Sequence, residues 1–438
     1  MPARLRHQPN RVHVLACAGV LLTLAGAALA APAVVPRTER VSVSSNGVQG
    51  QRASRAPALS GDGRFVVFTS SAENLVPGDT NRKSEVFVRD PKTGRTRRVS
   101  VTSNGAQANH SSGGASISSN GRYVVFASAA SNLVPHDSNR REDVFLRDLG
   151  RHRTTRVSVS STGKQRTGAS SDGVISADGH SVAFVYSNGV PQVFVRHLDT
   201  HKTERVSVSR SGKSGNDGSF AVTISGNGRL IAFESFASNL VSGDTNARGD
   251  VFVRDLKART TRRISVSTGG AQGNLESFSP SISGDGRVVA FASHASNLVG
   301  GDTNGTFDTF LRDLENRTTE RISVGSSGDQ ANGGSAPDAL GNGAISAHGE
   351  FVVFTSLASN LVPNDSNDAG DVFLRDIAHR TTTRLSVNAA GSPGNALSSG
   401  GVVSADGRFV GFTSDATNLV GGDTNGRSDV FVRGPLGP

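Results

Sequence analysis

The chain has 438 residues, a formal net charge of +9, one cysteine and no tryptophan. Because that cysteine is Cys17, close to the N-terminus, the rest of the chain is excluded from disulfides, thiol catalysis and cysteine-ligated zinc. Basic residues alternate with acidic residues and form no block. We therefore expect no nucleic-acid partner, which would need a clustered basic face.

The N-terminal segment has the features of a secretory signal peptide. A basic stretch precedes an apolar run from Val12 to Ala30, which closes in a small-x-small pattern. A retained membrane anchor fits less well because the apolar run is short, and a lipid on Cys17 would leave the apolar residues beyond it without a role. We predict a signal peptide at residues 1–30 and a secreted, extracellular domain at residues 31–438, with no membrane span after cleavage.

One sequence pattern then recurs seven times. Each copy reads Ser-x-Asp/Asn-Gly-Arg-x-Val-x-Phe, with small variations, and Asp-Val-Phe-Val-Arg-Asp and Arg-Val-Ser-Val follow. The turns of successive copies lie 58, 58, 49, 58, 63 and 58 residues apart. A period of this size, built from short β-type runs, indicates a repeat architecture. The turns are centred on Asp62, Asn120, Asp178, Asn227, Asp285, His348 and Asp406.

Each copy predicts four β-strands. In the second copy we expect strands at Ala115–Ser118, Tyr123–Ser128, Asp143–Arg147 and Thr155–Ser160, because apolar and polar residues alternate there with a period of two. A tight Asn-Gly turn joins the first two strands, since glycine tolerates a positive φ. Helical periodicity is absent from the sequence.

Four-stranded antiparallel units in series are typical of propeller blades, so seven copies predict an all-β, seven-bladed β-propeller. The first Arg-Val-Ser-Val segment, Arg40–Val43, precedes the first turn, and no such segment follows Phe431. We therefore expect the N-terminal strand to complete the last blade. This closure would remove two free sheet edges.

The Ser-x-Asp-Gly-Arg turn before a Val-x-Phe strand, with Val-Phe-Val-Arg-Asp further on, resembles the WD40-like (PD40-type) repeat of TolB-like β-propellers. The resemblance covers about residues 37–433. That family usually has proline before the Asp-Gly of the turn, and often a tryptophan upstream. This chain has neither. At the proline position it has Gly61, Ser119, Ala177, Gly226, Gly284, Ala347 and Ala405.

Strand direction divides a four-stranded meander into two ends. The loops between the second and third strands and the connections between blades must emerge on one face, which we call the loop face. The tight turns emerge on the opposite face, the turn face. Since the long segments all lie on the loop face, we expect any ligand to bind there.

Six of the seven second-to-third loops share one pattern: Asn-Leu-Val, two variable residues, Asp-[Thr/Ser]-Asn, three variable residues and an acid. Spaced carboxylate and amide oxygens can bind calcium, which takes roughly 6–8 oxygen ligands. Asp and Asn also favour turns by bonding their own backbone, so both interpretations stay open. The candidate calcium ligands are Asp79, Asn81, Glu85, Asp137, Asn139, Asp143, Asp244, Asn246, Asp250, Asp302, Asn304, Asp308, Asp365, Asn367, Asp371, Asp423, Asn425 and Asp429.

The segments that connect the blades repeat as well, as in Gly105–Asn109 and Gly270–Asn274, which read Gly-Ala-Gln-x-Asn. They lead into the first strands, and we expect them near the mouth of the central channel. Their Gln and Asn side chains have two possible roles: to bind the backbone or a sugar of a partner, or to satisfy loop carbonyls.

No catalytic constellation stands out against the repeats: there is no Gly-x-Ser-x-Gly elbow, and the histidines lack metal-ligand spacing. We therefore predict a non-enzymatic binding or scaffolding propeller, monomeric, whose partner is an extracellular protein or a cell-envelope ligand. No catalytic residue and no cofactor other than calcium is expected. The alternative is an extracellular hydrolase or lyase with a site at the channel mouth, for which Asp329, Asp338 and Asp368 are the first candidates.

Overall fold

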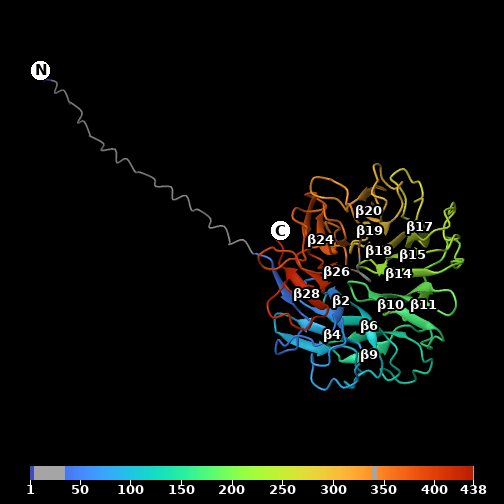
Figure 1. Cartoon of the computed structure of the whole chain (residues 1–438). Helices are drawn as coiled ribbons and strands as arrows, with labels where there is room; N and C mark the ends of the chain where they lie inside the picture. Colours follow the sequence, from blue (N-terminus) through green and yellow to red (C-terminus); the bar gives the residue numbers. More distant parts are fainter. Residues whose placement is uncertain (4–34, 338–342, 438) are drawn as a thin grey trace. The chain divides into compact units, whose positions relative to one another are not determined.

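A computed structural model describes residues 1–3, 35–337 and 343–437. From Val34 onward the chain forms one compact unit. Within the described residues the strands form seven four-stranded antiparallel sheets, arranged in a ring (Figure 1). This confirms the all-β, seven-bladed propeller. No helix of the described residues combines the length and the apolar character of a membrane span. The predicted signal peptide lies outside the described residues, apart from its first three.

The blades follow one another in chain order, and strands one to four of each run from the channel outward. Blades 1 to 4 consist of β2 (Ser54–Leu59), β3 (Val66–Ser70), β4 (Glu85–Asp90) and β5 (Arg95–Arg98); β6 (Ser112–Ile117), β7 (Tyr123–Ser128), β8 (Asp143–Asp148) and β9 (Arg153–Arg156); β10 (Ala169–Ile175), β11 (Ser181–Ser187), β12 (Gln192–His197) and β13 (Thr203–Arg205); and β14 (Ser219–Ile224), β15 (Leu230–Ser235), β16 (Asp250–Asp255) and β17 (Thr260–Arg263). Blades 5 to 7 consist of β18 (Ser277–Ile282), β19 (Val288–Ser293), β20 (Asp308–Asp313) and β21 (Thr319–Arg321); β22 (Ser335–Ala336), β23 (Phe351–Ser356), β24 (Asp371–Asp376) and β25 (Thr381–Arg384); and β26 (Ser398–Val403), β27 (Val410–Ser414), β28 (Asp429–Gly434) and β1 (Arg37–Arg40).

The N-terminal strand completes the last blade, as predicted. β1 pairs with β28, so that Arg40 lies opposite Phe431 (Figure 1, blue beside red). The expected bounds of this strand, Arg40–Val43, are wrong, because every fourth strand ends at its arginine instead of beginning there. Beyond Arg40 the hydroxyl of Ser42, rather than a backbone carbonyl, accepts the N–H of Val430 at 3.1 Å. A side-chain hydroxyl thus takes the place of a backbone acceptor at this point, and the regular strand pairing ends.

The first strands bend where they line the central channel. In β2 the pairing register shifts between Arg55 and Ala58, which is a β-bulge, and Ala56 has a φ of 54°. Blades 2, 3, 4, 5 and 7 have the same shift in their first strands. A bulge takes residues out of the ladder and re-aims their side chains. These strands also begin earlier than predicted: β6 starts at Ser112, not at Ala115.

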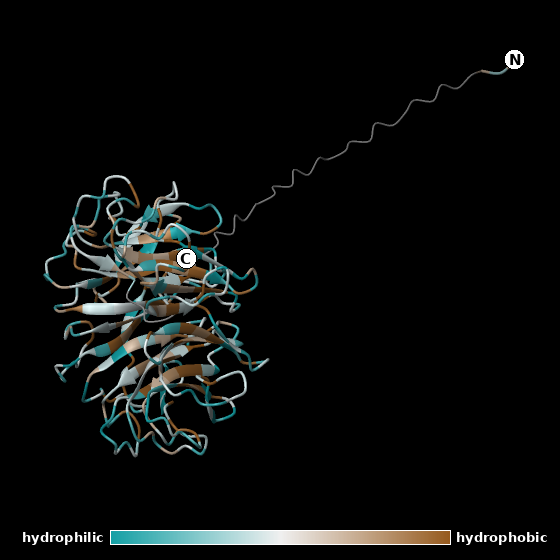
Figure 2. Ribbon diagram, turned by 90° about the vertical axis from the view of Figure 1, so that its right-hand side faces the viewer, coloured by the Kyte–Doolittle hydropathy of each residue, from teal (hydrophilic) through white to brown (hydrophobic). Residues whose placement is uncertain are grey.

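The core lies between neighbouring blades. In each blade one phenylalanine of the second strand stacks on one of the third, as Phe68 does on Phe87, with ring centroids 5.7–6.1 Å apart. Valines and isoleucines of the adjoining blade pack against these pairs. Figure 2 shows the result: hydrophobic colour follows the strands, and the loops are mostly hydrophilic.

On the turn face, a closed ring of backbone hydrogen bonds joins neighbouring blades. In five blades the residue before the Asp-Gly turn is the donor, so a proline there would remove the N–H. The bond therefore disfavours proline at this position in those five blades. Among the described residues the bonds run from Gly61 to Ser119, Ser119 to Ala177, Asp178 to Gly226, Gly226 to Gly284, Asp285 to Ala347, Ala347 to Ala405 and Ala405 to Gly61, at 2.8–3.0 Å from N to O.

Candidate functional site

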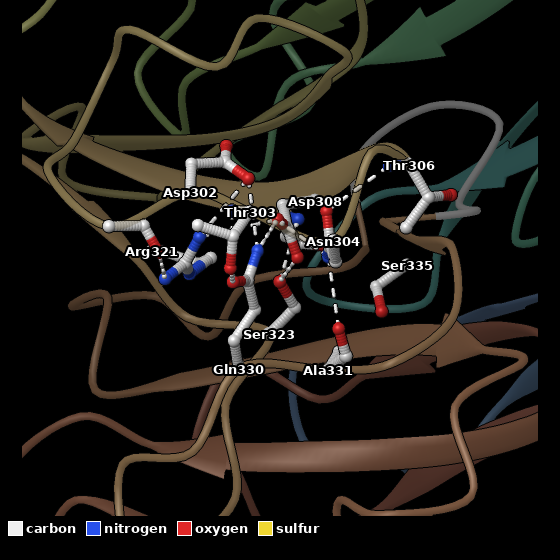
Figure 3. A network of polar contacts seen from close by, with 12 residues as sticks. Asp302, Thr303, Asn304, Thr306, Asp308, Arg321, Ser323, Gln330, Ala331 and Ser335 are labelled. Carbon is white, nitrogen blue, oxygen red and sulfur yellow. Dashed lines mark hydrogen bonds and ion pairs between the residues drawn. The ribbon is translucent and has the colours of Figure 1, made fainter.

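The predicted calcium ligands of each loop meet an arginine. In blade 5 (Figure 3), Nη1 of Arg321 lies 3.4 Å from Oδ1 of Asp302 and 3.5 Å from Oδ2 of Asp308. The amide of Gln330 donates to the same two carboxylates, at 2.9 and 3.1 Å. The hydroxyl of Ser323 donates to the second oxygen of Asp308 at 2.6 Å. We call this group of side chains an arginine cluster.

The cluster recurs because the repeat places its members at fixed positions. The arginine ends the fourth strand, the serine follows it by two residues, the acids come from the second-to-third loop, and the glutamine comes from the connection to the next blade. In blade 7, for example, Gln49 donates to Asp423 and Asp429, at 2.8 and 2.7 Å. The arginines that lie within 4.0 Å of both loop acids are Arg40, Arg98, Arg156, Arg263, Arg321 and Arg384.

The electrostatics are those of an internal ion pair. The carboxylate of Asp308 is fully buried, and burial raises its pKa, while the hydrogen bonds from Ser323 and Gln330 and the charge of Arg321 act in the opposite direction. Burial of a charge is tolerated only when the charge is paired and hydrogen-bonded. Each cluster supplies both conditions from its own side chains.

The donor atoms of the clusters do not fit a bound calcium ion. The asparagine turns its N–H₂ group, not its oxygen, toward the acid: Nδ2 of Asn304 lies 3.1 Å from Oδ2 of Asp308. Its oxygen accepts the N–H of Thr306 at 3.1 Å, and a guanidinium already lies beside both carboxylates. The described residues contain no group of three or more His, Cys, Asp or Glu that could hold a metal. Calcium binding stays a prediction that titration can decide.

Three blades depart from the common cluster. Blade 1 has Glu85, and burial raises its pKa to about 8, while the charge of Arg98 acts in the opposite direction. Blade 3 lacks the loop, and Gln192 stands in place of the acid, where it accepts a hydrogen bond from Ser207 at 2.8 Å. In blade 6, Pro393 takes the position of the glutamine.

Most of the glutamine and asparagine side chains of the connecting segments bind within the protein. Gln165 and Gln272 donate to the loop acids of their clusters. The side chains of Asn109 and Asn274 bond to a serine that follows a second strand, for example from Nδ2 of Asn109 to Oγ of Ser131 at 3.0 Å. Their backbone N–H groups donate to the side chain of the next asparagine, as Asn109 does to Asn132. Of the two predicted roles, the structure supports the internal one.

Of the three acids suspected of catalysis, the two that the structure describes are not in contact with each other. Asp329 lies in the connection before blade 6, where Ser327 donates to its carboxylate at 2.5 Å. Asp368 lies in the loop of the same blade, with a φ of 50°. Asp338 falls outside the described residues. No contact joins Asp329 to Asp368.

Residues that break the repeat lie on the loop face, beside the ends of second strands and the starts of first strands. Four large apolar side chains there are exposed: Phe236 (42%), Leu275 (40%), Leu357 (64%) and Leu397 (44%). Leu357 and Leu397 both lie within 3.2 Å of the position that a β-carbon on Gly370 would take, so they are neighbours across blades 6 and 7. We call Phe236, Leu275, Leu357 and Leu397 the apolar rim.

A cavity of about 460 Å³ adjoins this rim, between blades 7, 1 and 2. It contains the charged residues Arg55 and Asp415 and one residue of the rim, Leu397. Hydroxyl groups, small apolar side chains and the backbone of the first-strand bulges form the rest of its wall. The remaining lining residues are Ala56, Pro57, Gly114, Ala115, Ser399, Gly400, Val402, Thr413, Ser414 and Ser428.

The sequence repeats alone do not indicate the residues of the apolar rim and the cavity, because these side chains differ from copy to copy. Alignment of the copies gives the signal that could have found them. The residue directly after the second strand is Ser71 in blade 1 and Ala129 in blade 2, but Phe236, Leu357 and Asp415 in blades 4, 6 and 7. The loop acids, by contrast, are shared because they hold the blades together.

Comparison with known proteins supports the fold. The sequence matches no protein-family profile and no curated protein. An oligogalacturonate lyase in complex with manganese is similar in structure, with a TM-score of 0.51 and 10% identity over 92% of this chain and 90% of the other. TolB from Acinetobacter baumannii gives a TM-score of 0.41 and 15% identity over 76% of this chain, which spans 63% of the TolB chain.

At this identity the likeness to the lyase shows the fold alone. The molecule is a seven-bladed β-propeller whose four-stranded blades close through the N-terminal strand, and its repeat resembles that of TolB-like propellers.

Proposed function

We propose that this protein is a secreted, non-enzymatic propeller that binds an extracellular or cell-envelope partner at the channel mouth of its loop face. The observation that supports this is the position of the residues that break the repeat. The apolar rim is exposed on this face, while the loop acids are used in internal clusters. Exposed apolar side chains beside a cavity are typical of a binding site.

The test is loss of binding on substitution of the rim. The purified protein is immobilised and exposed to the envelope and culture fractions of its own cells, and the retained components are identified. Phe236→Asp combined with Leu357→Asp should abolish retention, because both changes place charge on the apolar surface. Arg64→Ala, which removes a side chain of the turn face, is the control and should leave retention unchanged. Retention that survives the double substitution would contradict the proposal.

The alternative is a lyase or hydrolase at the same mouth, and one observation favours it. Burial raises the pKa of Glu234 to about 7, and the charge of Glu276 acts in the same direction. A carboxyl group with a pKa near neutrality can act as a general acid or base. Turnover of an acidic oligosaccharide such as oligogalacturonate, lost in Glu234→Gln, would establish the enzyme and displace the pure binding function.

A further inference from the structure

We propose that the cavity between blades 7, 1 and 2 binds a free amino acid or short peptide as a zwitterion. The carboxylate of the ligand pairs with Arg55, its ammonium group pairs with Asp415, and an apolar side chain packs on Leu397. This inference rests on the proposed binding function, since it names the class of ligand for the same face of the propeller.

Arg55 is a charge that the repeat does not require. Its side chain is exposed in the cavity, and no ion pair or hydrogen bond joins its guanidinium to any described residue. The arginines of the six clusters, in contrast, each contact two acids. The corresponding first-strand positions of the other blades are neutral: Gly113, Ser171, Phe220, Phe278, Ala336 and Ser399.

Asp415 supplies the opposite charge in the same cavity. Its carboxylate accepts a hydrogen bond from Oγ of Ser428 at 2.5 Å and makes no ion pair with Arg55. Two opposite charges that share a cavity but do not pair leave both available to a ligand. A guanidinium binds a carboxylate through two parallel N–H bonds, and a carboxylate accepts from an ammonium group. A ligand that satisfies both therefore carries one carboxylate and one ammonium.

The remaining wall suits a peptide backbone. The bulges take Ala56, Gly114 and Gly400 out of the sheet ladder, and all three line the cavity. Backbone groups that leave the ladder at a bulge are available to the amide of a ligand. A volume of about 460 Å³ lies within the range of small-molecule sites.

The apolar part of the wall favours a peptide over a sugar. Leu397 is 44% exposed and continues the cavity into the apolar rim. Sugars usually stack on tryptophan or tyrosine. The chain has no tryptophan, and neither Tyr123 nor Tyr186 lines this cavity.

The test uses calorimetry with three forms of one dipeptide: free Leu-Leu, N-acetyl-Leu-Leu without the ammonium, and Leu-Leu amide without the carboxylate. We expect Leu-Leu to bind and each capped form to bind at least tenfold more weakly. In Arg55→Gln, the free dipeptide and its amide should bind equally. In Asp415→Asn, the free dipeptide and its acetyl form should bind equally. Arg210→Gln, which removes an exposed arginine outside the cavity, is the matched control.

Equal binding of the free and capped dipeptides, or no effect of Arg55→Gln, would overturn the proposal, as would absence of binding by Leu-Leu and by free leucine. Binding of an acidic oligosaccharide that depends on Arg55 would assign the cavity to a sugar instead. These failures can be told apart from failure of the proposed function. If no dipeptide binds but substitution of the apolar rim still abolishes partner retention, the binding function stands and the peptide assignment falls.

Discussion

The hydroxyl of Ser42 donates a hydrogen bond to the carboxylate of Asp429 at 2.5 Å, although the two residues lie 387 positions apart in the chain. The same serine-to-acid bond forms within a single stretch of chain in blade 5, from Ser323 to Asp308. The repeat therefore builds its last cluster from both ends of the propeller. The closure of the ring at blade 7 therefore uses the same serine-to-acid hydrogen bond as the other blades.

The first prediction concerns the arginine clusters. Asp308→Ala should lower the free energy of unfolding by about 3 kcal/mol, because it leaves the half-buried guanidinium of Arg321 with only one acid and removes the acceptor of Ser323. Urea denaturation measures the change. Asp199→Ala, at a carboxylate that is 69% exposed, is the control and should change stability by less than about 0.5 kcal/mol. An equal effect of the two substitutions would contradict the structural role.

The second prediction concerns calcium. If the arginines already serve as the cations of the loops, the melting temperature in EDTA should equal that in millimolar calcium. A ligand bound only by the folded state would raise it, because binding stabilises by RT ln(1 + [L]/Kd). Scanning calorimetry in the two buffers makes the comparison. A rise of several degrees in calcium would show that the loop acids bind metal in spite of the arginines.

The third prediction concerns pH. Burial raises the pKa of Glu234 from its usual 4.5 to about 7, so the folded protein holds a proton that the unfolded chain releases near pH 4.5. Stability from this group is therefore lost as the pH rises from about 4.5 to 7. Glu234→Gln keeps the uncharged form. Its stability should be closest to that of the wild type at pH 5 and should exceed it by roughly 2 kcal/mol at pH 8, allowing for partial exposure.

Urea denaturation at pH 5, 6, 7 and 8 measures this difference. Glu315→Gln, at an exposed side chain in a turn, serves as the control and should show no pH-dependent gain. A gain from Glu234→Gln that is constant across the pH range would show that the effect does not come from titration of the carboxyl group.

The fourth prediction concerns the ring of backbone bonds on the turn face. Ala405→Pro removes the N–H that donates to the carbonyl of Gly61 at 2.9 Å, and should lower the free energy of unfolding by about 1–2 kcal/mol. Ala177→Pro is a matched control, because in blade 3 the donor is the N–H of Asp178. The control should cost less. Equal costs would show that the inter-blade bond does not determine which turns accept proline.

The sequence by itself determined the fold. The period of the turns gives the number of blades, and the position of the first Arg-Val-Ser-Val segment gives the closure by the N-terminus. Both follow from local rules: a period of two makes strands, and Asx-Gly makes a hairpin turn. The ends of the fourth strands were placed wrongly because the hydroxyl of Ser42, and of its counterparts, replaces a backbone acceptor. Strand propensity carries no information on that replacement.

Only the tertiary structure decided what the loop acids contact. Asp302 and Asp308 have the spacing of metal ligands, but Arg321 and Gln330 reach them from segments 13 to 28 residues further along the chain. Likewise, Arg55 and Asp415 share a cavity although 360 residues separate them (415 − 55). Closing the ring brings the first and last blades together, and this contact between distant segments depends on the assembled propeller. Local spacing therefore predicted the acids, and the folded blades, with ring closure for blade 7, determined their partners.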